Sequence, residues 1–202
     1  IAVSIENNGL KDAHLKELAA LQNLTTLSLD AEKVTVAGLK ELSALKSLTT
    51  LILKTPDMTD AGLKELASLQ NLTTLDLISR WATAAGLKEL TALKKLTTLK
   101  LCGSVTDAGL KELAPLTGLT TLHLIGTNVT DAGLKHLAPF GNLLELSLLA
   151  GITDAGLKEL AALKYLTDLQ LPFTKVTGTG LKELAPLKYL TTLHLSFTKV
   201  TD

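Results

Sequence analysis

The sequence is poor in cysteine and in aromatic residues, and it carries no net charge. Among its 202 residues there is one cysteine, Cys102, and 3% of the residues are aromatic. A single cysteine cannot form an internal disulfide, which excludes the class of small secreted domains held together by cystines. Twenty basic residues balance twenty acidic residues, so no net field attracts nucleic acid or an anionic membrane. We therefore expect no nucleic-acid partner.

Long apolar runs are also missing. No apolar stretch approaches the roughly 20 residues that span a bilayer, so we expect no membrane insertion. The first residues, Ile1 to Ile5, have neither the basic segment nor the long apolar stretch of a secretory signal. The sequence therefore contains no visible targeting segment, and it leaves the localisation of the protein open.

Leucine, by contrast, is abundant and recurs in a repeat of 24 residues. The unit LTTLSLDAEKVTVAGLKELSALKS covers residues 24–47, and Leu48 begins it again. Two of the later units are one residue shorter, and each deletion falls in a loop. We expect residues 1–202 to form a single repeat domain of about eight units, which starts and ends inside a unit and has no evident caps. Later units begin at Leu72, Leu96, Leu119, Leu143, Leu166 and Leu190.

Each unit combines a strand pattern with a helix pattern. Alternating leucines such as Leu75 and Leu77 indicate a strand with one face turned inward. Leucines spaced three apart, as in residues 63–69, indicate a short helix with an apolar stripe. Thr59 is a candidate N-cap of that helix, and Asp60 lies in its first turn. A glycine recurs within seven of the eight expected helices, which we interpret as a sign of close packing between helix and sheet.

Strand, helix and strand in close succession predict parallel strands joined by right-handed crossovers. Repetition of this unit predicts a curved α/β solenoid of nine short strands and eight short helices. The strands form its inner face and the helices its outer face. A single unit buries too few residues to be stable alone, so stability is expected to be collective.

The repeated LxxLxL segment followed by a short helix resembles the leucine-rich repeat, and the match covers essentially the whole chain. The phrase VTDAGLKEL at residues 105–113 is similar to the bacterial 24-residue type, LTTLxLxxTxVTDAGLKELA. It is also similar to the GALA-type repeats of plant-pathogen F-box effectors. The resemblance implies a horseshoe with a parallel concave sheet and short convex helices, which binds proteins or other ligands, usually on the concave face.

The sequence departs from that family in two ways. The asparagine that many members carry after the strand is absent, and threonine hydroxyls are expected to replace part of its hydrogen bonding. Disulfide-bonded terminal caps are also absent, which favours an intracellular or bacterial setting. The uncovered leucine layers at both ends suggest flanking caps or further repeats. They also leave open the oligomeric state, including end-to-end stacking of chains.

Information about partners should lie in the positions that vary between units, because the repeated positions are explained by packing. The residue between the two strand leucines points to the concave side and varies most along the chain. In this row we expect Asp76, Lys100, His123 and Gln170 to bind a protein partner. Two residues further along each strand, an apolar row offers anchors, although these side chains could instead be partly buried packing. The row comprises Ile78, Cys102, Ile125, Leu149 and Pro172, of which Ile78, Ile125 and Leu149 are the expected anchors.

Three further features are candidates for the same surface. Glu145 and Asp168 replace threonine on adjacent strands, where they either bind a cation or a basic partner or reflect drift on a solvated sheet. Trp81 is either an anchor at the rim or a space-filling residue. Phe173 and Phe197 occupy the same place in consecutive units and are expected to stack at the edge of the sheet.

No catalytic or metal site is expected, and no cofactor. His123 and His194 share a row but stand about 14 Å apart by strand spacing, which is too far to share a metal ion. Cys102 has Lys100 and His123 nearby, yet an open sheet excludes little water. We therefore expect a non-catalytic protein-interaction module. The alternatives are the substrate-recognition region of a larger protein, such as a ubiquitin-ligase adaptor, a ligand-free structural or designed array, and an enzyme that depends on Cys102.

Overall fold

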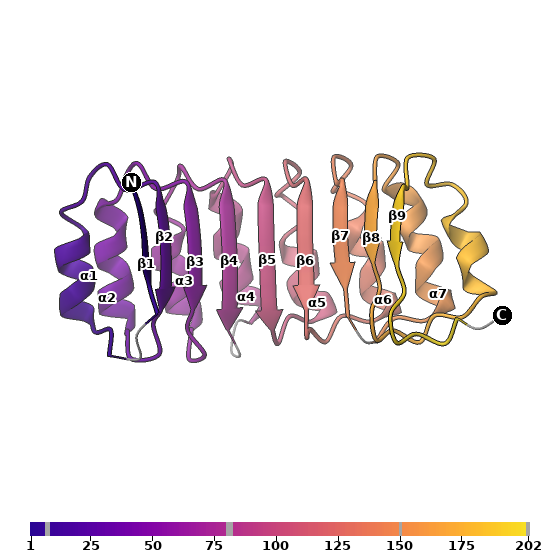
Figure 1. Cartoon of the computed structure of the whole chain (residues 1–202), viewed down its shortest axis with the longest axis horizontal. Helices are drawn as coiled ribbons and strands as arrows, with labels where there is room; N and C mark the ends of the chain where they lie inside the picture. The colour runs from indigo at the N-terminus through magenta and orange to yellow at the C-terminus, as the bar shows by residue number, and fades with distance from the viewer. Residues whose placement is uncertain (7–8, 80–82, 150, 201–202) are drawn as a thin grey trace.

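The computed structural model of the chain describes residues 1–6, 9–79, 83–149 and 151–200 (Figure 1). Within these ranges nine parallel strands form one sheet, and their spatial order follows the sequence. The nine predicted strands are thus present. They are β1 (Ala2–Ile5), β2 (Thr26–Asp30), β3 (Thr50–Lys54), β4 (Thr74–Ser79), β5 (Thr98–Gly103), β6 (Thr121–Ile125), β7 (Glu145–Leu148), β8 (Asp168–Gln170) and β9 (Thr192–His194).

A helical segment connects each pair of neighbouring strands, as the sequence predicts. Towards the C-terminus these segments tighten, because a growing part of each becomes a 3-10 turn, and the last is 3-10 throughout. The α-helices are α1 (Asp12–Leu18), α2 (Val36–Glu41), α3 (Asp60–Leu66), α4 (Ala84–Glu89), α5 (Asp107–Glu112), α6 (Asp131–Leu134) and α7 (Asp154–Leu157). The 3-10 turns are η1 (Leu42–Ala44), η2 (Leu90–Ala92), η3 (Lys135–Leu137), η4 (Lys158–Ala162) and η5 (Gly180–Leu184).

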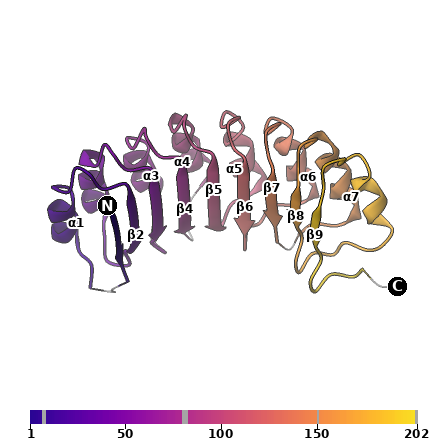
Figure 2. The same ribbon diagram turned by 45° about the horizontal axis from the view of Figure 1, so that its top comes forward.

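The sheet and the helices form two layers. In Figure 1 the strands lie in front and the helices behind them, and in Figure 2 the row curves so that the sheet is on the concave side. The core lies between the layers and is almost entirely leucine, with strand residues such as Leu75 and Leu122 fully buried. Among the residues that the structure describes, no helix combines the length and the apolar character that crossing a bilayer requires.

A ladder of threonine hydroxyls joins neighbouring units where the strands begin. The Thr97 hydroxyl donates to the carbonyl oxygen of Thr73 at 3.2 Å, and Thr120 donates to Thr97 at the same distance. The ladder continues through most units and supplements the backbone pairing of the strands. Its other members are the hydroxyls of Thr25, Thr49, Thr73, Thr167 and Thr191. In the loop after the strand, where the family carries asparagine, hydroxyls such as that of Thr174 bond a carbonyl of their own unit instead.

The recurring helix glycine has a different role from the one expected from the sequence. A Cβ atom at Gly156 would collide with the carboxylate of Asp131, which belongs to the preceding helix. The glycine therefore makes room for a neighbouring helix rather than for the sheet. Thr59 caps α3 as predicted, because its hydroxyl accepts a hydrogen bond from the Gly62 amide at 3.4 Å.

Candidate functional site

The varied row on the strands lies on the concave face. Asp76 pairs in register with Lys100, and Lys100 pairs with His123, so these three residues occupy neighbouring strands β4, β5 and β6. Ser147 on β7 pairs with His123 and with Gln170 on β8. Because the flanking leucines are buried in the core, the side chains of this row point away from it. The structure thus places the four predicted polar residues in one continuous row.

The members of this row differ in exposure. Asp76, Lys100 and Gln170 are half-buried, whereas His123 is only 9% exposed. The His123 imidazole Nε2 lies 2.8 Å from Glu145 Oε1, and among the described residues this is the only ion pair within 4.0 Å. His123 therefore offers a partner little surface of its own, and its effect on the concave face is to hold the Glu145 side chain.

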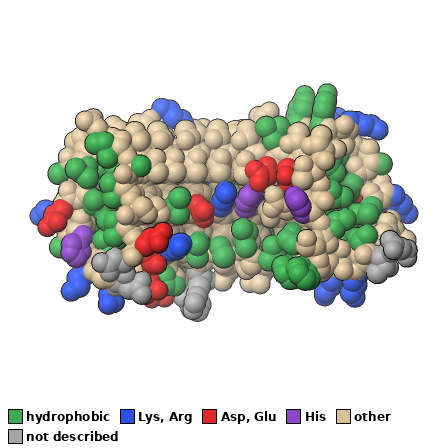
Figure 3. Space-filling view, viewed as in Figure 1, with side chains coloured by type: hydrophobic (Ala, Val, Ile, Leu, Met, Phe, Trp, Pro, Cys, Tyr) green, Lys and Arg blue, Asp and Glu red, His purple; other side chains and the backbone are tan. Residues whose placement is uncertain are grey.

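Glu145 and Asp168 are direct neighbours across strands β7 and β8. Their position in the repeat is held by threonine on the flanking strands, by Thr121 on β6 and by Thr192 on β9. The Asp168 Oδ1 atom accepts a hydrogen bond from Gln170 Nε2 at 3.1 Å. In Figure 3 acidic and histidine side chains gather to the right of centre on the sheet face. The structure thus brings His123, Glu145, Asp168 and Gln170 into one polar cluster.

Ser147 lies in the middle of this cluster, and sequence reasoning did not single it out. It is 3% exposed, and its hydroxyl makes no hydrogen bond with any residue that the structure describes. The repeat did place Ser147 opposite Gln170 and two residues after Glu145, which is the information that could have indicated it. Serine itself gave no signal, because Ser28 occupies the same row in an earlier unit.

The predicted apolar row lies beside the polar one. Ile78 pairs with Cys102, and Cys102 pairs with Ile125. Ile78 and Ile125 are 38% and 39% exposed, which places them on the surface rather than in the core. Cys102, Leu149 and Pro172 are half-buried. The predicted rim residue Trp81 lies outside the described part of the chain.

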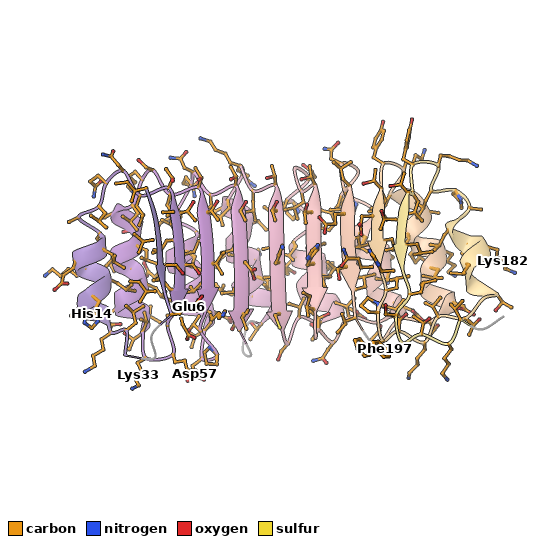
Figure 4. All side chains as sticks on the ribbon, in the orientation of Figure 1. Glu6, His14, Lys33, Asp57, Lys182 and Phe197 are labelled. Carbon is orange, nitrogen blue, oxygen red and sulfur yellow. The ribbon has the colours of Figure 1, made fainter. Side chains whose placement is uncertain are left out.

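Two aromatic pairs flank the polar cluster at opposite edges of the sheet. The rings of Phe173 and Phe197 stack with centroids 4.7 Å apart, as predicted, and are 56% and 77% exposed. Phe197 lies at the lower edge in Figure 4. The second pair, Tyr165 and Tyr189, has centroids 6.1 Å apart and was missed. The sequence could have indicated this pair, because two successive units carry tyrosine immediately before their first leucine, where an earlier unit carries Asn71.

Both phenylalanines have left-handed backbone conformations. Their φ angles are +58° at Phe173 and +60° at Phe197, and the same place in an earlier unit is held by Gly126 with φ +62°. A residue with a side chain is disfavoured in this region, whereas glycine is not. The exposed aromatic pair therefore occupies a position where the local backbone favours glycine.

A hollow lies apart from these residues, at the N-terminal end of the solenoid. It measures about 420 Å³, and its walls include Ile5, Leu10, Leu18 and Leu21. Leu21 is 39% exposed, whereas Leu45, its counterpart in the next unit, is 1% exposed. In every later unit the corresponding side is covered by the preceding unit. The first described unit has no unit before it in this structure, so this side is exposed as a hollow. The hollow is not connected with the polar cluster.

The side chains that could bind a metal ion or act in catalysis are spread over several strands in the described part of the chain. Among the described residues, no group of three or more histidine, cysteine, aspartate or glutamate side chains is placed to hold a metal ion. His123 and His194 lie three strands apart, on β6 and β9. Cys102 is a half-buried free cysteine on β5.

No protein-family model and no curated protein sequence matches the chain. Solved structures of leucine-rich repeat proteins are similar to it. An internalin (inlF) from Listeria monocytogenes superposes with a TM-score of 0.62 at 22% identity, over 93% of this chain and 59% of the internalin. Internalin C2 (inlC2) from the same organism superposes with a TM-score of 0.54 at 26% identity, over 100% of this chain and 73% of the internalin.

This chain spans less than two thirds of the length of the inlF structure. The likeness concerns the path of the backbone, with its parallel concave sheet and short convex helices. Together with the nine-stranded sheet, it establishes the architecture predicted from the sequence. The chain folds as a right-handed α/β leucine-rich repeat solenoid.

Proposed function

We propose that this protein is a non-catalytic interaction module that binds a protein partner on the concave face of its sheet. The observation that carries the proposal is the contrast between the two sides of each strand. The inward residues are leucines with almost no exposure, such as Leu99 and Leu146, in every unit from β2 to β8. The residues between them change from strand to strand in charge, size and polarity.

The proposed binding surface has the composition of a protein-recognition site. Asp76, Lys100 and Gln170 supply polar groups, and Ile78 and Ile125 supply exposed apolar side chains beside them. Leu149 is proposed as a third apolar anchor. An open, shallow sheet suits a macromolecule better than a small molecule, because small-molecule sites are enclosed pockets. Similarity to the internalin solenoids supports the fold on which this surface is built.

The proposal is tested with a display library of natural protein fragments, from which binders of the wild-type chain are selected. The binding of each purified fragment is then measured against the double variant His123→Ser, Ile125→Ser. Serine occurs at both places in other units, as Ser28 and Ser196, so the repeat tolerates the change. We expect affinity to fall about tenfold or more, because the exposed Ile125 side chain is lost from the surface and Glu145 is no longer held by His123.

The matched control is Lys64→Ala, Lys111→Ala, which alters two exposed residues on the convex helices α3 and α5. It should leave affinity unchanged. Fragments that bind the concave double variant as tightly as the wild type, or that lose affinity only for the convex variant, contradict the proposal.

The other function expected from the sequence, substrate recognition within a larger protein, uses the same surface. It differs in what the recognised protein undergoes after binding. The fragments that depend on the concave face would then be substrates of the larger protein, and a change in their modification or stability in its presence distinguishes the two functions.

A further inference from the structure

Glu145 and Asp168 form a pair of like charges whose one basic neighbour in the described residues is His123, which contacts Glu145 alone. They are in register on adjacent strands, which lie about 4.8 Å apart. Like charges placed directly opposite each other destabilise a sheet. In the described ranges no lysine or arginine lies within 4.0 Å of either carboxylate, and His123 reaches only one oxygen of Glu145. The pair therefore carries an unmet requirement for positive charge.

The Ser147 hydroxyl provides a second, independent sign of a missing ligand. Ser147 is 97% buried by neighbouring side chains, and its hydroxyl bonds to no residue of the described part of the chain. Side-chain oxygens that are fully covered all have partners there, so this hydroxyl is still reached by solvent. The only way to it is from the concave face, because Leu146 and Leu148 on either side point into the core. We refer to the two carboxylates and this hydroxyl, which lies two residues further along β7 from Glu145 and beside Gln170, as the socket.

The groups that remain unused in this socket are mainly acceptors. Glu145 and Asp168 each use one carboxylate oxygen, towards His123 and Gln170 respectively. Their second oxygens remain, together with the Ser147 hydroxyl. An anion is excluded by charge. The ligand that matches is a cation with several N–H donors and no acceptor, which describes the planar guanidinium group.

The surroundings favour a side chain of a protein over a free ion. Exposed apolar groups lie on both sides of the socket along the strands, with Leu144 and Tyr165 at one edge and Phe173 at the other. They suit the aliphatic stem of an arginine and the apolar residues next to it in a partner. No set of three ligating side chains in the described residues surrounds the socket, as a bare metal ion would need.

We infer that Glu145, Asp168 and Ser147 form a socket for the guanidinium group of an arginine side chain presented by the protein partner. This inference rests on the proposed concave-face function and names the chemistry of its partner. Glu145 and Asp168 accept N–H bonds from the guanidinium, and the Ser147 hydroxyl accepts one more. His123 and Gln170 orient the two carboxylates.

The test uses a phage-displayed library of random peptides, selected against the wild-type chain. We expect arginine to be enriched in the selected peptides. Binding of synthetic peptides to Glu145→Thr, Asp168→Thr should weaken at least about tenfold, because charge-assisted bonds to both carboxylates are lost. Threonine is the residue that other units carry at this place, so the variant retains the repeat. Ser147→Ala, which removes a single hydroxyl, should weaken binding roughly threefold to tenfold.

Two controls separate the socket from a general effect of charge. The variant Glu32→Gln, Asp57→Asn removes the same number of negative charges from exposed positions in two loops and should bind normally. A peptide with citrulline in place of arginine keeps the shape of the side chain without its charge, and it should bind as weakly to the wild type as the arginine peptide does to the threonine double variant.

The outcomes distinguish failure of this inference from failure of the proposed function. Peptides without arginine enrichment that lose affinity for the His123→Ser, Ile125→Ser variant but not for the Glu145→Thr, Asp168→Thr variant overturn the socket and retain concave-face binding. Equal binding of lysine and arginine peptides overturns the assignment of a guanidinium. Peptides whose binding is unaffected by every concave variant overturn both proposals.

Discussion

Asp131 connects its own unit to the next one through two hydrogen bonds from Thr153. The Thr153 backbone amide donates to Asp131 Oδ1 at 2.8 Å, and the Thr153 hydroxyl donates to Oδ2 at 2.6 Å. Since Thr153 is also the N-cap of α7, the contact fixes where the next helix begins. The same pair of bonds occurs four more times, between Asp12 and Thr35, Asp60 and Thr83, Asp107 and Thr130, and Asp154 and Thr177.

The unit that begins at Leu72 lacks this bridge, because Ala84 stands where the aspartate would be. We predict that Ala84→Asp raises the free energy of unfolding by about 1 kcal/mol, through new bonds to Thr106. Gly109 has no Cβ that would block the new carboxylate, just as Gly133 has none that blocks the carboxylate of Asp107. The measurement is urea unfolding followed by circular dichroism. In a Thr106→Val background the gain should shrink, and a gain of the same size there would contradict the bridge.

The bridge made by Asp154 should depend on pH. The hydroxyl and the backbone amide of Thr177 bond this carboxylate and hold its pKa below the ordinary value of 3.8. A carboxyl whose pKa is lower in the folded state stabilises the fold above its unfolded pKa, and this contribution disappears as the pH falls through the folded pKa. Asp154→Asn should therefore be less stable than the wild type at pH 6, and the difference should diminish towards pH 2.

This prediction is checked by unfolding both proteins over that pH range. Asp57→Asn serves as the control, since Asp57 lies in an exposed loop at the lower edge in Figure 4. A stability difference between wild type and Asp154→Asn that is the same at pH 6 and pH 2 would show that the charge of Asp154 is not involved.

A methyl group at position 156 should disrupt the packing of two helices. We predict that Gly156→Ala lowers the free energy of unfolding by about 1–3 kcal/mol, because the new Cβ collides with the Asp131 carboxylate and approaches Leu134 Cδ1 to 2.9 Å. Gly141→Ala is the control, because a methyl group at position 141 would have no heavy atom within 4 Å. In an Asp131→Ala background, Gly156→Ala should cost less, and an unchanged cost would refute the collision.

Phe173 should tolerate glycine better than alanine. Phe173→Gly removes the strain of a side chain in the left-handed region, which should stabilise the fold by about 1 kcal/mol. It also removes the ring stack with Phe197, which should destabilise the fold by about 0.5–1.5 kcal/mol. Its stability should therefore remain within about 1 kcal/mol of the wild type. Phe173→Ala loses the stack and keeps the strain, so it should melt at a lower temperature than Phe173→Gly. The reverse order in a calorimetric scan would contradict this account.

The repeated parts of the fold were predictable from the sequence because each rests on a local pattern present in many copies. The spacing of Leu75 and Leu77 located β4, and Thr59 marked the start of α3. The role of the helix glycine was not predictable, since Asp131 and Gly156 meet only when two units stack. The interpretation from the sequence was right that glycine permits close packing, but wrong that the close neighbour is the sheet. The neighbour is the preceding helix.

The proposed site was predictable only in part. The register of the repeat placed Glu145 beside Asp168, and the sheet confirms this neighbourhood. The sequence did not show that His123 turns to Glu145 and is nearly covered, because side-chain pairing across strands depends on which rotamers the neighbours leave free. Tyr165 and Tyr189 were missed because they lie before the strands, away from the varied concave positions on which the prediction of a partner rested.

The parallel pairing of each strand with its sequence neighbours has an evolutionary consequence. The threonine ladder and the aspartate–threonine bonds each join a unit only to the next one. A duplication or loss of one whole unit therefore leaves the bonds among the remaining units in place. Such an event adds or removes one whole strand of the concave surface, together with the charged or apolar side chains that this strand carries. If the concave face binds a partner as proposed, recombination can thus rearrange its specificity without any change in how the chain folds.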